Sequence, residues 1–263
     1  MLEKNVKWGG GYLLPSPPII YTKFSSRYLG VRYYLDTLFD HMNSTAFYVL
    51  LICEALNLDK EETGLYVTGA LLHDVGKIKI KKEILVKSEP LNDLEWMEIK
   101  KHPLYGVGVV CEDYGVTEGV IPIIKYHHER YDGNGYYKVD QKAVPLGAKI
   151  VSIADAFDAM YSVRPYRNPM SFVSIIQEIN RCSGTQFDPS IVKIVYDYYG
   201  FLDGKKANAE SIKQIIERGE RWLNQLLEWD VPYLYIQSFN ALLDKFINEW
   251  YIIGLLPEYP GQK

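Results

Sequence analysis

The five histidines of this 263-residue chain are the side chains best suited to chemistry, and several of them adjoin acidic residues. Histidine is the commonest metal ligand in proteins, and a carboxylate beside it can bridge two cations while neutralising their charge. A single histidine on a helix is more often a packed or surface residue than a ligand, but the five together favour a metal site. The set is His41, His73, His102, His127 and His128, with Asp74 following His73 and Glu129 following His128.

The stretch HHERYDGNGYY, residues 127 to 137, carries two of these histidines and a glycine-containing loop. Neighbouring side chains on a helix diverge by about 100°. His127 and His128 can therefore share one metal only where a helix ends, and the sequence beyond them supplies such an end. Gly133 and Gly135 permit unusual backbone dihedrals that would let the loop approach a nucleotide closely, although an ordinary turn explains them equally well.

The elements that must position these residues are predicted to be helices, because apolar residues recur at helical spacing almost throughout. Asp59, followed by Glu62, resembles a capping box that opens a helix running to about Asp74 and stopped by Gly76. No stretch alternates as a confident strand does, so we predict an all-α fold. The expected helices cover residues 32–58 (one helix or two), 59–74, from 92, from 102, 117–128, 145–160, 171–182 and 188–199.

Length and composition bound the domain organisation. A chain that is 48% hydrophobic can bury a substantial core. We expect an irregular lead-in over residues 1–24, one domain over 25–200, and a helical extension over 201–263. The extension contains two amphipathic segments joined near residues 230–232. It fits either a hairpin that completes the core or an arm for homodimerisation or a signalling partner.

Charge and cysteine content exclude several classes of protein. The net charge of −4 does not favour binding to a nucleic acid polymer. Three widely spaced cysteines indicate neither a disulfide framework nor a zinc knuckle, which fits a reducing cytoplasm. No apolar run approaches the roughly 18 residues of a membrane span, so we expect a soluble, cytoplasmic protein.

The motifs together resemble a known family. HDVGK, residues 73–77, resembles the signature of the HD phosphohydrolase superfamily, and HHERYDGNGYY resembles the extended signature of its HD-GYP branch. His41 stands where the branch has its first ligand, and His102 in HPLYG matches its next histidine element. Asp155 in IADAFDAM, RPYRNPMS at 164–171 and GTQFDP at 184–189 match the later elements. These motifs, found together and in this order, indicate the family far more specifically than the dipeptide His73-Asp74 alone.

This resemblance implies an HD-domain helical bundle that holds two divalent metal ions, with iron the first choice and manganese the next. A ligand set rich in nitrogen and oxygen, with open positions, suits these metals better than a closed zinc site. Two such cations roughly 3.5 to 4 Å apart yield a bridging hydroxide that attacks phosphorus. The resemblance assigns one cation to His41, His73, Asp74 and Asp155, and the other to Asp74, His102, His127 and His128.

The resemblance further implies a phosphodiesterase that opens cyclic di-GMP to linear pGpG, with further cleavage to GMP left open. Lys77 lies one turn beyond His73 and could place its ammonium on a phosphate oxygen where charge grows; otherwise it is one of several solvated lysines. Arg164 and Arg167 suit bidentate phosphate contact or an internal salt bridge. Tyr136 either packs beneath the loop or touches the substrate.

Three positions depart from the branch. Tyr137 replaces the proline of GYP, Gln186 replaces a histidine of the closing element, and Thr37 stands where some members carry a glutamate that helps to hold a third metal. Because threonine is a poor substitute for that glutamate, we expect two metals rather than three. The departures leave two alternatives open: a phosphohydrolase for another nucleotide or phosphoester, and a catalytically weak module that senses cyclic di-GMP or binds a partner.

Overall fold

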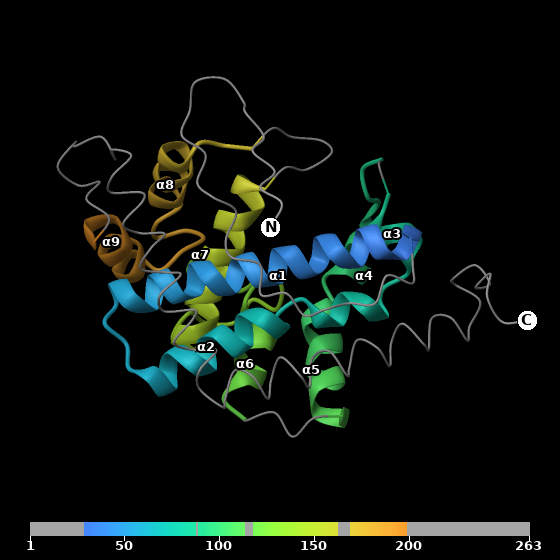
Figure 1. Cartoon of the computed structure of the whole chain (residues 1–263), viewed down its shortest axis with the longest axis horizontal. Coiled ribbons are helices and arrows are strands. Elements are labelled where there is room, and N and C mark those ends of the chain that lie inside the picture. Colours follow the sequence, from blue (N-terminus) through green and yellow to red (C-terminus); the bar gives the residue numbers. More distant parts are fainter. Residues whose placement is uncertain (1–28, 88, 114–117, 163–168, 199–263) are drawn as a thin grey trace, which may run out of the picture.

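The computed structural model describes residues 29–87, 89–113, 118–162 and 169–198, and every regular element in these ranges is a helix (Figure 1). The predicted all-α fold is therefore confirmed for this part of the chain. The elements are α1 (Leu29–Ala55), α2 (Lys60–Leu72), the 3₁₀ helix η1 (Val75–Lys79), α3 (Lys82–Leu85), α4 (Asp93–Ile99), α5 (His102–Asp113), α6 (Val120–Tyr126), α7 (Leu146–Tyr161), α8 (Phe172–Arg181) and α9 (Pro189–Tyr198).

Side-chain caps fix several helix starts. The Asp59 carboxylate accepts the backbone N–H of Glu62 at 2.9 Å and so opens α2. Asn92 and Glu95 form a complete capping box at the start of α4, each side chain bonding the other's backbone N–H. Such caps satisfy N–H groups that have no partner inside the helix. The starts predicted near residues 59 and 92 are confirmed. The helical pattern over residues 32–58 belongs to one helix rather than two, and this helix, α1, ends at Ala55.

Three local predictions differ from the structure. Helix α2 ends at Leu72 rather than near Asp74, and the tighter η1 follows it. Helix α6 begins at Val120, later than predicted, and the short α3 was not expected. η1 packs closely on α5: a Cβ on Gly76 would overlap the His102 carbonyl oxygen and the Gly106 backbone nitrogen. Close approach of η1 to α5 thus requires glycine at this position.

The apolar core has two parts, and the histidines lie where the parts meet. The larger part joins α1, α2 and α7, with α8 and α9 beside them, and includes fully buried Val49, Ala70 and Ile150. The smaller part joins η1, α5 and α6 around Val120 and Ile124. In Figure 1, α1 runs across α7 and α2 on one side of the molecule while α5 stands on the other side of α2. Burial of both parts fixes the helices that carry the site.

None of the described helices combines the length and the apolarity that a bilayer crossing requires. The predicted lead-in over residues 1–24 and the predicted extension over 201–263 lie outside the described residues. The proposed division into three segments therefore stays a prediction.

Candidate metal centre

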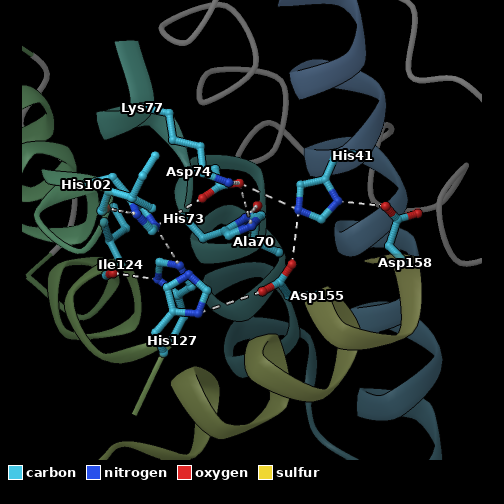
Figure 2. A network of polar contacts seen from close by, with 12 residues as sticks. His41, Ala70, His73, Asp74, Lys77, His102, Ile124, His127, Asp155 and Asp158 are labelled. Atoms are coloured by element: carbon cyan, nitrogen blue, oxygen red, sulfur yellow. Dashed lines mark hydrogen bonds and ion pairs between the residues drawn. The ribbon is translucent and has the colours of Figure 1, made fainter. Parts of the chain in front are cut away.

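Seven side chains from five separate parts of the chain converge between α1, α5 and α7 (Figure 2). His41 comes from the middle of α1, and Asp155 comes from α7. His73 and Asp74 occupy the turn between α2 and η1, and His102 is the first residue of α5. His127 and His128 follow the last residue of α6, so they lie at the helix end that shared binding of one metal requires.

The potential ligand atoms fall into two groups. In each group, one nitrogen or oxygen from every residue lies within 4.8 Å of the others. One group is His41, His73 and Asp155; the other is Asp74, His102, His127 and His128. Asp74 also approaches the first group, because its Oδ2 lies 3.6 Å from His41 Nε2 and 3.5 Å from His73 Nε2. A carboxylate in this position could provide an oxygen ligand to a metal in each group.

Hydrogen bonds to backbone carbonyls set the orientation of three imidazoles. The Nδ1–H of His73 donates to Ala70 at 2.6 Å, that of His102 to Ile99 at 2.8 Å, and that of His127 to Ile124 at 2.7 Å. In a neutral ring the other nitrogen, Nε2, then carries a lone pair. Metal-ligating histidines are commonly oriented in this way, with the far nitrogen bonded to a carbonyl or a carboxylate.

The resulting lone pairs face one another, which is the strongest indication that these residues fit a cation. Nε2 of His102 lies 3.2 Å from Nε2 of His127, although neither ring retains a proton to place between them in this tautomer. Nε2 of His73 and Oδ1 of Asp74 are buried without a hydrogen-bond partner. Buried polar atoms are normally satisfied, so these donors suit divalent metals.

Asp158, which the sequence did not identify, holds the fourth imidazole. Its carboxylate accepts Nδ1–H of His41 at 2.6 Å, while Nε2 of His41 lies 3.0 Å from Asp155 Oδ1. Asp158 is almost fully buried. It follows Asp155 by three residues, so both carboxylates lie on the same face of α7. That spacing was the available signal for this residue.

The electrostatics of the cluster keep its carboxylates ionised and three of its histidines neutral. Burial lowers the pKa values of His73, His127 and His128, the last to about 3. Burial opposes ionisation of Asp74, but Lys77 and the nearby histidines hold its pKa well below the usual value. Burial also opposes protonation of His41, yet hydrogen bonds to Asp155 and Asp158 raise its pKa to about 9. At neutral pH the carboxylates and the imidazoles of His73, His127 and His128 therefore hold free lone pairs, whereas His41 carries a proton that a metal would displace.

Lys77, the predicted catalytic cation, lies at the edge of the cluster. Its ammonium bonds to Oδ2 of Asp74, and 24% of its side chain is exposed. It is thus neither a distant surface lysine nor a fully enclosed one. Its role in catalysis stays a prediction.

The loop after His128 is held by Glu129, another residue whose role the sequence analysis missed. One carboxylate oxygen of Glu129 accepts the backbone N–H of Tyr137 at 2.7 Å, and the other accepts that of Val139 at 2.9 Å. Gly133 has φ of +74°, which favours glycine. A Cβ on Gly135 would lie 2.5 Å from the Glu129 Cα. The two predicted loop glycines are therefore required by local geometry.

A cavity of about 280 Å³ opens beside the cluster. His128 and Asp155 line one part of it, and Tyr136 and Gly135 line another. Trp96 and Lys100 also line it, although neither was a candidate from sequence; they come from α4 and its C-cap. The remaining lining residues are Glu129, Arg130, Asn134, Ser152 and Gln186. Of the predicted substrate residues, Arg164 and Arg167 lie outside the described residues.

Comparison with known proteins gives a family match across most of the described region. The family model described as "HD domain" matches residues 31–191. The cyclic di-GMP phosphodiesterase response regulator RpfG of Xanthomonas campestris pv. campestris is 36% identical over 145 residues, covering 54% of this chain and 38% of that protein. The 3'3'-cGAMP-specific phosphodiesterase 2 of Vibrio cholerae is 30% identical over 161 residues, covering 60% of this chain and 31% of that protein.

A solved structure supports the same architecture. Bd1817, an HDG"Y"P protein from Bdellovibrio bacteriovorus, superposes with a TM-score of 0.51 at 21% identity, covering 61% of this chain and 51% of that one. The chain spans only about a third of the length of the two curated relatives above. The family match therefore concerns the helical region over residues 31–191.

Proposed function

The chain belongs to the HD domain family, in its HD-GYP branch, and from this membership and its seven-residue cluster we propose that it is a metal-dependent cyclic dinucleotide phosphodiesterase. The main support for the proposal is the pair of adjoining donor groups, with Asp74 close enough to both groups to be a ligand in each. Two divalent metals, iron first and manganese next, suit this mixture of nitrogen and oxygen donors.

When bound, two such cations supply an activated water near neutral pH and stabilise charge on phosphoryl oxygens. The chain's own residues do the rest. The ring orientations set by Ala70, Ile99 and Ile124 direct the Nε2 lone pairs inward. The cavity brings a phosphodiester against His128 and Asp155. Lys77, partly exposed and bonded to Asp74, places a positive charge where a non-bridging oxygen gains negative charge.

Cyclic di-GMP is the proposed substrate, because relatives that are 30–36% identical to this chain are named cyclic di-GMP phosphodiesterases. Linear pGpG is the proposed product. A second substrate, 3'3'-cGAMP, is favoured by relatives named as phosphodiesterases specific for it, at 30% and 35% identity. The three cysteines are free, which supports a reducing compartment such as the cytoplasm.

A hydrolysis assay tests the proposal. The full chain is loaded anaerobically with Fe²⁺ or with Mn²⁺ and incubated with cyclic di-GMP, and linear products are separated by ion-exchange chromatography. We expect metal-dependent formation of pGpG, and we expect Asp74→Asn to reduce turnover by at least about 10³-fold, because the shared ligand loses its charge.

Asp197→Asn provides the matched control, since Asp197 lies in an exposed pair with Lys193 on α9. Turnover by Asp74→Asn at the rate of this control would remove Asp74 from the reaction centre. Absence of hydrolysis of any cyclic dinucleotide by the metal-loaded chain would refute the proposed function.

A further inference from the structure

The cavity beside the candidate metal centre has an aromatic corner that begins at the predicted ligands His102 and His128, with the Tyr136 ring centroid 6.2 Å and 4.4 Å from theirs. The rings of Trp96 and Tyr136 lie 6.5 Å apart between centroids and meet at 77°, so they form two walls rather than a stack. Tyr136 also lies against His128, with centroids 4.4 Å apart. A continuous wall therefore leads from a predicted metal ligand to Trp96, which is 45% exposed. A planar group bound near the metals would meet these rings.

A cation completes the corner. The ammonium of Lys100 lies 5.8 Å from the centroid of Trp96 and 5.8 Å from that of Tyr136. Lys100 is the C-cap of α4, and its carbonyl accepts the hydroxyl of Tyr137 at 3.1 Å. This bond ties the end of α4 to the loop that carries Tyr136. The corner is thus built from two elements that are held together.

Two of the chain's three departures from its branch lie in this cavity or beside it. Tyr137 replaces proline, and its N–H donates to Glu129 while its hydroxyl reaches Lys100; a proline offers neither group. Gln186, which replaces histidine, lines the cavity. Tyr137 and Gln186 therefore lie where a substrate would be recognised, and not among the seven candidate ligands, whereas the third departure, Thr37, lies in α1.

We propose that Trp96, Lys100 and Tyr136 form a nucleobase subsite that selects guanine over adenine; this inference rests on the proposed function. Aromatic side chains stack on any base, so Trp96 and Tyr136 supply affinity. An ammonium only donates hydrogen bonds. Guanine presents two acceptors, O6 and N7, on one edge, whereas adenine pairs its N7 acceptor with an N6 donor. Lys100 thus matches guanine and opposes the adenine amino group.

The size of the cavity suits one base. Clefts that enclose a drug-sized ligand measure roughly 300–1,000 Å³, and this cavity is about 280 Å³. One nucleotide of a cyclic dinucleotide fits such a volume, with its phosphate toward His128 and Asp155 and its base in the aromatic corner. The second nucleotide would lie outside it.

Equilibrium binding separates this inference from the proposed catalysis. Guanosine 5'-monophosphate and adenosine 5'-monophosphate are titrated into the metal-loaded full chain by calorimetry. We expect the wild type to bind the guanine nucleotide about tenfold more tightly. Trp96→Ala should weaken binding of both nucleotides about 5- to 100-fold, and Trp96→Phe should recover much of that loss. Lys100→Met should remove the guanine preference.

One matched control comes from α4, and the other comes from the turn between α4 and α5. Leu94 is 77% exposed on α4 and does not line the cavity, so Leu94→Ala controls for loss of an apolar side chain. Lys101→Met controls for loss of charge, because Lys101 pairs with Glu98 instead. Circular dichroism establishes that each variant is folded.

The inference is overturned if the wild type binds the two nucleotides equally or binds neither, or if Trp96→Ala binds both as tightly as Leu94→Ala. It is also overturned if Lys100→Met keeps the preference. Failure of cyclic di-GMP hydrolysis together with the expected binding pattern would refute the catalytic proposal and leave the subsite intact.

Discussion

His41 shows how one residue of the cluster is controlled by its neighbours. Its two ring nitrogens lie between Asp158, at 2.6 Å, and Asp155, at 3.0 Å. Asp158 fixes the ring so that Nε2 faces the other donors, and its charge increases the basicity of the imidazole. Partners of this kind outside the ligand set typically contribute a factor of 10–100 to metal affinity. Asp158 is therefore the residue whose removal best tests ring orientation.

We expect Asp158→Ala to weaken Mn²⁺ binding about 10- to 100-fold, measured by competition with a fluorescent chelator, because His41 loses its orienting acceptor. Asp158→Asn keeps a hydrogen-bond acceptor without the charge, so its affinity for Mn²⁺ should lie between that of the wild type and that of Asp158→Ala. Asp197→Ala removes an exposed carboxylate and should bind like the wild type. Equal affinity of Asp158→Ala and wild type would show that Asp158 does not support the site.

The convergence of the seven candidate ligands was predictable from sequence, because histidines are few and stand at fixed places in motifs, as with His73 before Asp74; their role as ligands stays a prediction. Asp158 and Trp96 were not. Asp158 is one acidic residue among many until α1 packs against α7 and brings His41 to it. Trp96 belongs to no motif, and only folding of α4 toward the loop places its ring near Tyr136. Contacts between distant segments decide both roles.

At the scale of elements, the close packing of η1 on α5 is the feature that brings together Asp74 and His102, two members of one donor group. Gly76 lies in η1, two residues after Asp74, and its Cα faces the backbone of His102 and Gly106. No side chain fits between these backbones. The separation of η1 and α5 therefore sets the position of Asp74 relative to His102, whose Nε2 lies 3.1 Å from Asp74 Oδ1.

We expect Gly76→Ala to lower the free energy of unfolding by at least about 3 kcal/mol, the upper end of typical overpacking costs, because its Cβ would overlap backbone atoms. Urea unfolding measures the change. Gly108 on α5 has no atom within 4 Å of an added Cβ, so Gly108→Ala should be neutral or stabilising by up to about 1 kcal/mol. Equal stability of the two variants would contradict the packing described.

Helices with caps were predictable from sequence, as Asp59 and Asn92 show, because a cap is a local interaction. The end of α2 at Leu72 and the presence of η1 were not, and neither was the close approach of Gly76 to α5, which is a contact between distant segments. The same distinction applies to the loop after His128. Its glycines were visible in the sequence, but the clamp by Glu129 appears only when Tyr137 and Val139 fold back onto it.

At the scale of the whole molecule, the donors link α1, the α2–η1 turn, α5, the end of α6, and α7. Bound metal would therefore join both parts of the core. We expect Mn²⁺ at 100 times its Kd to stabilise the fold by about 2.7 kcal/mol and to raise the Tm by about 5–10 °C, measured by differential scanning fluorimetry. Asp74→Asn should show little of this shift. An equal shift in that variant would mean that the metal binds elsewhere.

The central claim is that the seven side chains hold two metals around the shared carboxylate of Asp74. Anomalous X-ray diffraction from crystals of the Mn²⁺-loaded chain tests it most directly. We predict two anomalous peaks on opposite sides of Asp74, one with His41, His73 and Asp155 and the other with His102, His127 and His128. A single peak, or peaks that lie away from Asp74, would contradict the account.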